Sequence, residues 1–177
     1  MDAVFDVNVL VDALPRGASY EDLKSSPLYQ LFRIIVEAGL DAGVRVHSCA
    51  HIRTTAARMI VRKCGWSPAM AEKFLVETHD AMVNSTRGRM VETKMTAREA
   101  AGIAFRVNLE DDEYHDDPQV FMAAEVSGAT VIVTSDRGFG NLTATEVEAW
   151  SPAEFRDEIV ARIRRRIAER KSATIAA

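Results

Sequence analysis

The chain has 177 residues, of which 47% are apolar and 27% charged, and its net charge at pH 7 is −4. These values are typical of one soluble globular domain with a real core, and they exclude a strongly basic nucleic-acid coat protein. No apolar run is long enough to span a bilayer, and Asp2 and Asp6 interrupt the region where a signal peptide would be apolar or basic. We therefore expect a cytoplasmic protein without a membrane segment. Cys49 and Cys64 lack a metal-site spacing and are expected to be reduced structural thiols.

Short apolar strands and amphipathic helices are predicted to alternate along the chain. Ser26-Pro27 has the form of a helix start, and Thr96 with Glu99 and Ser151 with Glu154 have the form of capping boxes. The expected strands are residues 3–5, 44–46, 90–91, 130–134 and 146–150, and the expected helices are 27–38, 49–63, 68–82, 97–107, 118–126 and 152–171. Helices between buried strands indicate a parallel α/β sheet with right-handed crossovers.

Acidic residues follow two of the predicted strands directly. Asp136 comes just after the β-branched run Thr130–Thr134, and Asp6 comes just after the apolar run at residues 3–5. In open α/β sheets ligands bind at the carboxyl ends of the strands. A third acidic position, Asp116-Asp117, precedes the helix that leads into the strand at residues 130–134. Three acids at three element ends predict a site for a hard divalent cation, which prefers oxygen ligands.

Each of these residues also has a structural interpretation. Asp117 precedes Pro118 and would serve as a helix N-cap, unless Asp116 takes that role and leaves Asp117 free. Asp6 and Asp136 end apolar strands, where a carboxylate has fewer structural roles than at a helix start. The site interpretation is therefore favoured for both. The polar neighbours are open to both interpretations: Asn8 orients Asp6 or shapes a turn, and Ser48 and Thr134 bind a carboxylate or phosphate or act as ordinary cap and strand residues.

Three segments together resemble the PIN domain family, which includes VapC-type toxins and related metal-dependent nucleases. Residues 5–11, Phe-Asp-Val-Asn-Val-Leu-Val, resemble that family's opening strand with its first acid. Asp117, followed by Val120 and Ala123-Ala124, resembles its third motif, and residues 133–139 resemble its last strand and final acid. Ser151-Pro152 and a helix carrying Phe155 are similar to one branch of the family, so the resemblance covers roughly residues 3–160.

The resemblance implies a three-layer α/β/α sandwich with a central parallel sheet of about five strands over residues 1–160. Residues 161–177 would then form a basic C-terminal helix extension and tail. It implies Mg²⁺ or Mn²⁺ bound by Asp6, Asp117 and Asp136, with polar support from Asn8, Ser48, Thr54 and Thr134. It further implies an endoribonuclease that hydrolyses RNA phosphodiester bonds. In the toxin branch, it implies the toxin of a type II toxin–antitoxin pair, with an antitoxin partner and a homodimer.

The chain departs from the family pattern at two acids. The family usually carries a second acid, most often Glu, early in the helix after the second strand, but no Asp or Glu occurs between Asp41 and Glu72. Thr54, Thr55 or an acid from Glu110–Asp116 would take that place. A fourth acid is also missing, because Gly138 stands shortly after Asp136. The alternative function is therefore a catalytically degenerate domain that binds RNA or a protein partner.

Further patterns are less specific. A phosphatase-like hydrolase would also use strand-end Asp residues, but the chain lacks the Asp-x-Asp pair expected there after the first strand. His47 and His51 have the spacing of a ligand pair, although surface or helix-end roles are favoured. Basic residues form three clusters, which are Arg53/Arg58/Arg62/Lys63, Arg87/Arg89/Lys94 and Arg162/Arg164/Arg165/Arg166/Arg170/Lys171. Each cluster either binds phosphate or is an ordinary charged helix face. The third cluster could also interact with the helix dipole or with an acidic antitoxin.

Overall fold

A computed structural model describes residues 1–14, 22–109 and 116–175. Its centre is a five-stranded sheet with the strand order β3-β2-β1-β4-β5, in which every neighbouring pair is parallel. The strands are β1 (Asp2–Phe5), β2 (Arg45–Cys49), β3 (Met90–Val91), β4 (Val131–Val133) and β5 (Glu148–Trp150). The predicted parallel α/β sheet is confirmed.

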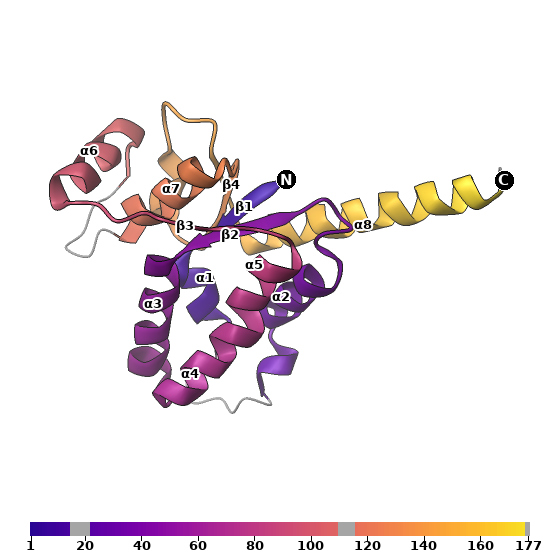
Figure 1. Ribbon diagram of the computed structural model, residues 1–177, viewed down its shortest axis with the longest axis horizontal. Coiled ribbons are helices and arrows are strands. Elements are labelled where there is room, and N and C mark those ends of the chain that lie inside the picture. The colour runs from indigo at the N-terminus through magenta and orange to yellow at the C-terminus, as the bar shows by residue number, and fades with distance from the viewer. Residues whose placement is uncertain (15–21, 110–115, 176–177) are drawn as a thin grey trace.

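Helices cover both faces of this sheet and complete a three-layer α/β/α sandwich (Figure 1). The α-helices are α1 (Val7–Asp12), α2 (Pro27–Ala38), α3 (Ala50–Met59), α4 (Pro68–Leu75), α5 (Ala81–Ser85), α6 (Ala97–Val107), α7 (Asp116–Ser127) and α8 (Pro152–Ile175). Helix α7 packs on β1, β2 and β4 and against α6, whereas α5 packs on β2 and α8 on β5. Within the described residues, no helix is both long and apolar enough to cross a membrane.

The two central strands are buried because each lies between two helical layers. Ala3, Val4 and Phe5 of β1 pair with Val131, Ile132 and Val133 of β4, and all six are at most 3% exposed. A continuous apolar run is the expected sequence of a strand covered on both faces. This register brings the carboxyl ends of β1 and β4 to the same level of the sheet.

An aromatic cluster ties the first strand to two helices. The ring of Phe5 meets Phe32 of α2 edge-on at 6.0 Å and Phe155 of α8 edge-on at 5.3 Å between centroids. Each such pair contributes about 0.5–1.5 kcal/mol beyond the area that it buries. The cluster therefore anchors the beginning of α8 in the core.

Both capping boxes form as predicted. At the start of α6 the Thr96 N–H donates to Glu99 Oε2 at 2.7 Å, and the Glu99 N–H donates to Thr96 Oγ1 at 3.3 Å. Ser151 and Glu154 make the matching pair at the start of α8, at 2.8 and 3.2 Å. These contacts are local in sequence, so the residue pattern alone was sufficient to predict them.

Some element boundaries differ from the predictions. The chain turns into the short helix α1 directly after Asp6, so residues 5–11 are not one continuous strand. The helices predicted at 49–63 and 68–82 each change to π-helical turns, at Ile60–Cys64 and Val76–Asp80. The described part of α7 starts at Asp116, so Asp117 lies within the helix and does not precede it as an N-cap.

Candidate functional site

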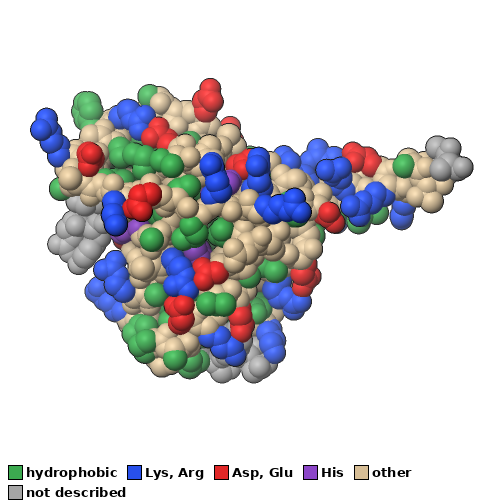
Figure 2. All heavy atoms as spheres, viewed as in Figure 1, with side chains coloured by type: hydrophobic (Ala, Val, Ile, Leu, Met, Phe, Trp, Pro, Cys, Tyr) green, Lys and Arg blue, Asp and Glu red, His purple; other side chains and the backbone are tan. Residues whose placement is uncertain are grey.

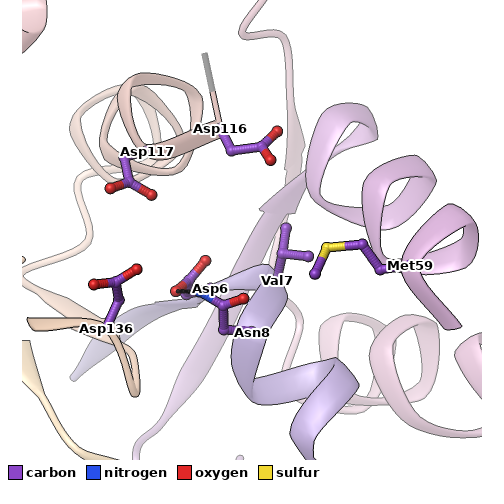
Figure 3. Close-up of a pocket in the computed structure, with 7 residues that line it drawn as sticks. All are labelled: Asp6, Val7, Asn8, Met59, Asp116, Asp117 and Asp136. Carbon is purple, nitrogen blue, oxygen red and sulfur yellow. Dashed lines mark hydrogen bonds between the residues drawn. The ribbon is translucent and has the colours of Figure 1, made fainter. Parts of the chain in front are cut away.

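Four aspartates line one cavity at the carboxyl ends of β1 and β4. The cavity has a volume of about 230 Å³ and is lined by Asp6, Val7, Asn8, Met59, Asp116, Asp117 and Asp136. Asp6 follows β1 and its N–H donates to Val133 O of β4 at 2.9 Å, which holds the two strand ends together. In Figure 3 the carboxylates of Asp6, Asp117 and Asp136 point toward a common space. The structure thus brings together the three acids that the sequence singled out.

Asp6 is the most deeply placed of these acids, with 2% of its surface exposed. Its Oδ2 accepts hydrogen bonds from Thr134 Oγ1 at 2.8 Å and from Asn8 Nδ2 at 3.4 Å. Burial raises the pKa of the Asp6 carboxyl to about 6, the hydrogen bond from Thr134 opposes this rise, and the negative charge of Asp136 adds to it. Because burial disfavours the charged form of Asp6, a neighbouring cation would stabilise its carboxylate.

Asp136 is held by the turn that follows β4. Its Oδ1 accepts the N–H of Gly138 at 2.8 Å and so caps the 3₁₀ helix Arg137–Asn141. A Cβ atom added to Gly138 would lie 3.4 Å from Asp136 Oδ1 and 3.5 Å from Asp117 Oδ2. Gly138, which stands at the position of the missing fourth acid, therefore lies beside both carboxylates. Because it has no side chain, it places no group between them.

The region of the missing second acid holds a histidine–aspartate pair. His51 Nε2 lies 2.6 Å from Asp116 Oδ1, and Thr55 Oγ1 lies 3.4 Å from the same nitrogen. Thr54 is exposed and its hydroxyl donates to the backbone oxygen of Ala50 at 2.8 Å, so it does not reach the cavity. Asp116 is therefore the additional acid at the site among the described residues, and Glu110–His115 lie outside them.

Ser48 does not reach the cavity either, because it belongs to a buried network. Ser48 Oγ lies 2.6 Å from His79 Nε2, and His79 Nδ1 lies 2.7 Å from Asp80 Oδ1. Arg53 donates to both oxygens of Asp80 at 3.0 Å. This order of serine, histidine and aspartate resembles a hydrolase triad, but Ser48 and His79 are each only 2% exposed. The network is therefore structural.

A basic cavity adjoins the acidic one. It has a volume of about 340 Å³ and is lined by Thr55, Arg58, Met59, Arg62, Lys63 and Asp116. Met59 and Asp116 line both cavities, so the two are neighbours. Arg58 Nη2 donates to Thr55 Oγ1 at 2.9 Å, which holds the guanidinium near the shared wall. Phosphate groups suit a space lined by three cationic side chains.

The remaining sequence-based metal hypothesis is not supported by the positions of the histidines. His47 pairs with Asp2 at 2.8 Å, whereas His51 pairs with Asp116, so the two do not point at one ligand. Among residues 1–14, 22–109 and 116–175, no three His, Cys, Asp or Glu side chains lie close enough to hold one ion as they stand.

No model of a known protein family matches this sequence, and no curated protein matches it. The chemistry of the acidic cavity and its basic neighbour therefore carries the functional assignment.

Proposed function

We propose that this protein is a PIN-like, metal-dependent endoribonuclease that binds Mg²⁺ or Mn²⁺ in the acidic cavity and hydrolyses RNA phosphodiester bonds. The observation that carries the proposal is the convergence of Asp6, Asp117 and Asp136 on one cavity from three separate elements. Carboxylates gathered in this way repel one another unless a cation or a proton joins them. Burial is the main cause of the raised pKa of Asp6, and the negative charge of Asp136 adds to it.

The donor set fits a hard divalent cation. Among the described residues, every charged group that lines the cavity is a carboxylate, and Asn8 adds an amide next to Asp6. Mg²⁺ keeps several of its waters and commonly takes one or two carboxylates together with substrate phosphates. Such a hydrated ion does not need three protein ligands in direct contact, which agrees with the spacing of these side chains.

The side chains of the site divide the work of RNA cleavage. Asp6, Asp117 and Asp136 would hold a divalent cation, which would supply polarisation of a phosphate and a lowered pKa for a bound water. Thr134 and Asn8 keep Asp6 oriented toward the cavity, and His51 keeps Asp116 at the wall shared with the basic cavity. The basic residues, namely Arg58, Arg62 and Lys63, neutralise phosphates that flank the bond to be cleaved.

A toxin role in a type II toxin–antitoxin pair is part of the same proposal, with the motif resemblance as its support. An antitoxin that covers the acidic cavity, a homodimer and a cytoplasmic location belong to it. Its test is growth arrest of a bacterial host on induced expression of the chain. Arrest that disappears with Asp136→Asn supports the toxin role, and unaffected growth with the active protein contradicts it.

The second candidate is a degenerate domain that binds RNA or a protein partner without cleaving RNA. Two observations favour it: Thr54 turns away from the cavity, and Gly138 lies where a further carboxylate would complete the cluster. A cluster with fewer acids binds its cation more weakly, so catalysis is the property most sensitive to these two positions.

Cleavage of a mixed RNA pool tests the two candidates. The purified chain is incubated with Mn²⁺, with Mg²⁺ and with chelator, beside Asp136→Asn and beside Asp157→Asn as a matched control on the exposed side of α8. We expect metal-dependent cleavage that survives Asp157→Asn and is lost with Asp136→Asn. Equal background cleavage by all three proteins, with no response to either metal, contradicts the nuclease and favours the binding domain.

A further inference from the structure

Helix α8 extends well beyond the body of the protein. It has 24 residues, so it is roughly 36 Å long at the usual helical rise. Its beginning is anchored by Phe155 and Ile159, both completely buried, but every residue from Arg164 to Thr174 is exposed. Figure 1 shows this half projecting past the sheet and the other helices. The projecting half thus has no buried side chain among residues 164–174, although burial of an apolar face is the usual source of helix stability.

The projecting half carries the strongest concentration of positive charge in the chain. The ten residues 162–171, here named the α8 arm, contain six of the 22 Lys and Arg residues and one of the 26 Asp and Glu residues, a net charge of +5. The rest of the chain then holds 16 basic and 25 acidic residues, a net charge of −9. Figure 2 shows Lys and Arg side chains gathered along this projection.

Internal ion pairs neutralise only part of this charge. Arg162 and Arg165 share the carboxylate of Glu158, at 2.7 and 3.1 Å. Arg170 lies 3.6 Å from Asp41 in an exposed pair. In the described part of the chain, Arg164, Arg166 and Lys171 make no ion pair. The arm therefore keeps a large positive excess that faces solvent.

The base of the arm also forms one side of a cleft. Arg162, Arg165, Arg166 and Glu169 line a cavity of about 350 Å³ together with Ala42 and Gly43, which precede β2. Three of these four α8 side chains are guanidinium groups, whose planar donors match the oxygens of a phosphate. Ala42 and Gly43 precede the amino end of β2, whereas the acidic cavity lies at the carboxyl ends of the strands, so the cleft is separate from that cavity.

We infer that the α8 arm binds the sugar–phosphate backbone of nucleic acid and, given the proposed function, holds the RNA substrate away from the bond that is cleaved. An acidic protein partner fits less well, because protein interfaces have an apolar core. Among the exposed residues 164–174, Ile167, at 48% exposure, is the one large apolar side chain that could contribute to such a core. Consecutive arginines at 164–166 also distribute positive charge around the helix, which suits backbone contact without base recognition.

The test measures binding without cleavage. Fluorescence anisotropy of a labelled single-stranded RNA is followed in chelator, at several salt concentrations, for the full chain and for Arg164→Gln/Arg165→Gln/Arg166→Gln. The matched control is Lys24→Gln/Lys73→Gln/Arg98→Gln, which removes the same charge at three exposed positions elsewhere. Glutamine keeps a high helix propensity, and circular dichroism checks that both variants are folded.

We expect the arm variant to bind RNA at least about tenfold more weakly at low salt. Its log–log salt slope should fall by about 2, because each phosphate contact on a single strand contributes roughly 0.7. The control should stay within about twofold of the unchanged chain. Equal binding by the arm variant and the control overturns the inference, as does displacement of RNA by polyglutamate as effective as displacement by unlabelled RNA.

The two proposals fail separately. Loss of RNA binding in the arm variant, together with unchanged binding by Asp136→Asn, supports the arm even if the chain cleaves nothing. Metal-dependent cleavage by an arm variant whose RNA affinity is unchanged supports the nuclease proposal and contradicts the proposed role of the arm in RNA binding.

Discussion

Thr134 and Asp6 lie 128 residues apart in the chain, and the Thr134 hydroxyl donates a hydrogen bond of 2.8 Å to Asp6 Oδ2. The same hydroxyl oxygen accepts the N–H of Asp136 at 2.9 Å. One threonine therefore links the acid that ends β1 to the acid that follows β4. The resemblance to the PIN family predicts Thr134 as polar support for the acids, and its hydroxyl contacts both residues.

Thr134→Val is expected to weaken cation binding. The substitution removes the donor that lowers the pKa of Asp6 and leaves the Asp136 N–H without its partner. Loss of the buried hydrogen bond from Thr134 to the Asp6 carboxylate costs about 1–3 kcal/mol of unfolding free energy. A further rise in the pKa of Asp6 would weaken Mn²⁺ binding near pH 6 by up to roughly tenfold. Calorimetric titration with Mn²⁺ and urea unfolding measure the two effects. Thr134→Ser keeps the hydroxyl and should stay within about twofold, and an equal loss in both variants would contradict this role.

The stability of the cation-free protein is expected to fall as pH rises from about 4 to about 6. Burial raises the folded-state pKa of Asp6 to about 6, so the folded chain binds this proton more tightly than the unfolded chain, whose carboxyl has its usual lower pKa. The stabilisation is complete below the unfolded pKa and is lost through the folded one. Asp6→Asn should remove up to about 3 kcal/mol of this pH dependence.

Urea unfolding in chelator at pH 4 and pH 8 measures this difference for the unchanged chain, Asp6→Asn and the exposed control Asp157→Asn. A pH dependence that Asp6→Asn leaves intact would show that another group is responsible. Mn²⁺ should restore part of the stability of the unchanged chain at pH 8, because a bound cation replaces the proton.

Gly138→Asp is expected to strengthen cation binding by adding a carboxylate. The added Cβ would make ordinary contacts with Asp136 Oδ1 and Asp117 Oδ2, at 3.4 and 3.5 Å, so the backbone accepts a side chain there. The new carboxylate would complete the cluster at the fourth-acid position, with an increase in Mn²⁺ affinity of about tenfold, or 1.4 kcal/mol. Gly140→Asp is the matched control, because a Cβ there meets open space. Equal affinities of the two variants would show that position 138 does not face the ion.

Substitution of two cations in the basic cavity is expected to affect RNA binding more than turnover. Arg62→Gln/Lys63→Gln removes positive charge next to the wall that both cavities share. KM should rise about tenfold while kcat stays within about twofold, because these contacts hold the substrate in both the ground and the transition state. Steady-state cleavage kinetics give both values, with Lys73→Gln/Arg98→Gln as the control. A fall in kcat at unchanged KM would place these residues in the chemical step.

Local patterns in the sequence determined the elements and the strand-end acids. The capping boxes at Thr96 and Ser151 join residues three positions apart, so chain geometry alone brings their groups together. Asp6 and Asp136 were predicted on one edge because parallel strands bring their carboxyl ends to the same side of a sheet. The apolar runs that precede these acids predicted that the sheet would be covered on both faces.

Tertiary packing alone decided which other polar groups join these acids. Thr54 and Thr55 are neighbours in sequence, yet Thr54 faces solvent and Thr55 lies beside His51, because the side of α3 that meets α7 is set by burial. Asp116 lines the cavity from within α7, which is already helical at Asp116, two residues before the start at 118 that Pro118 predicted. Ser48 instead contacts His79, which lies 31 residues further along the chain. Such pairings depend on how helices pack over the sheet, and no spacing along the chain encodes them.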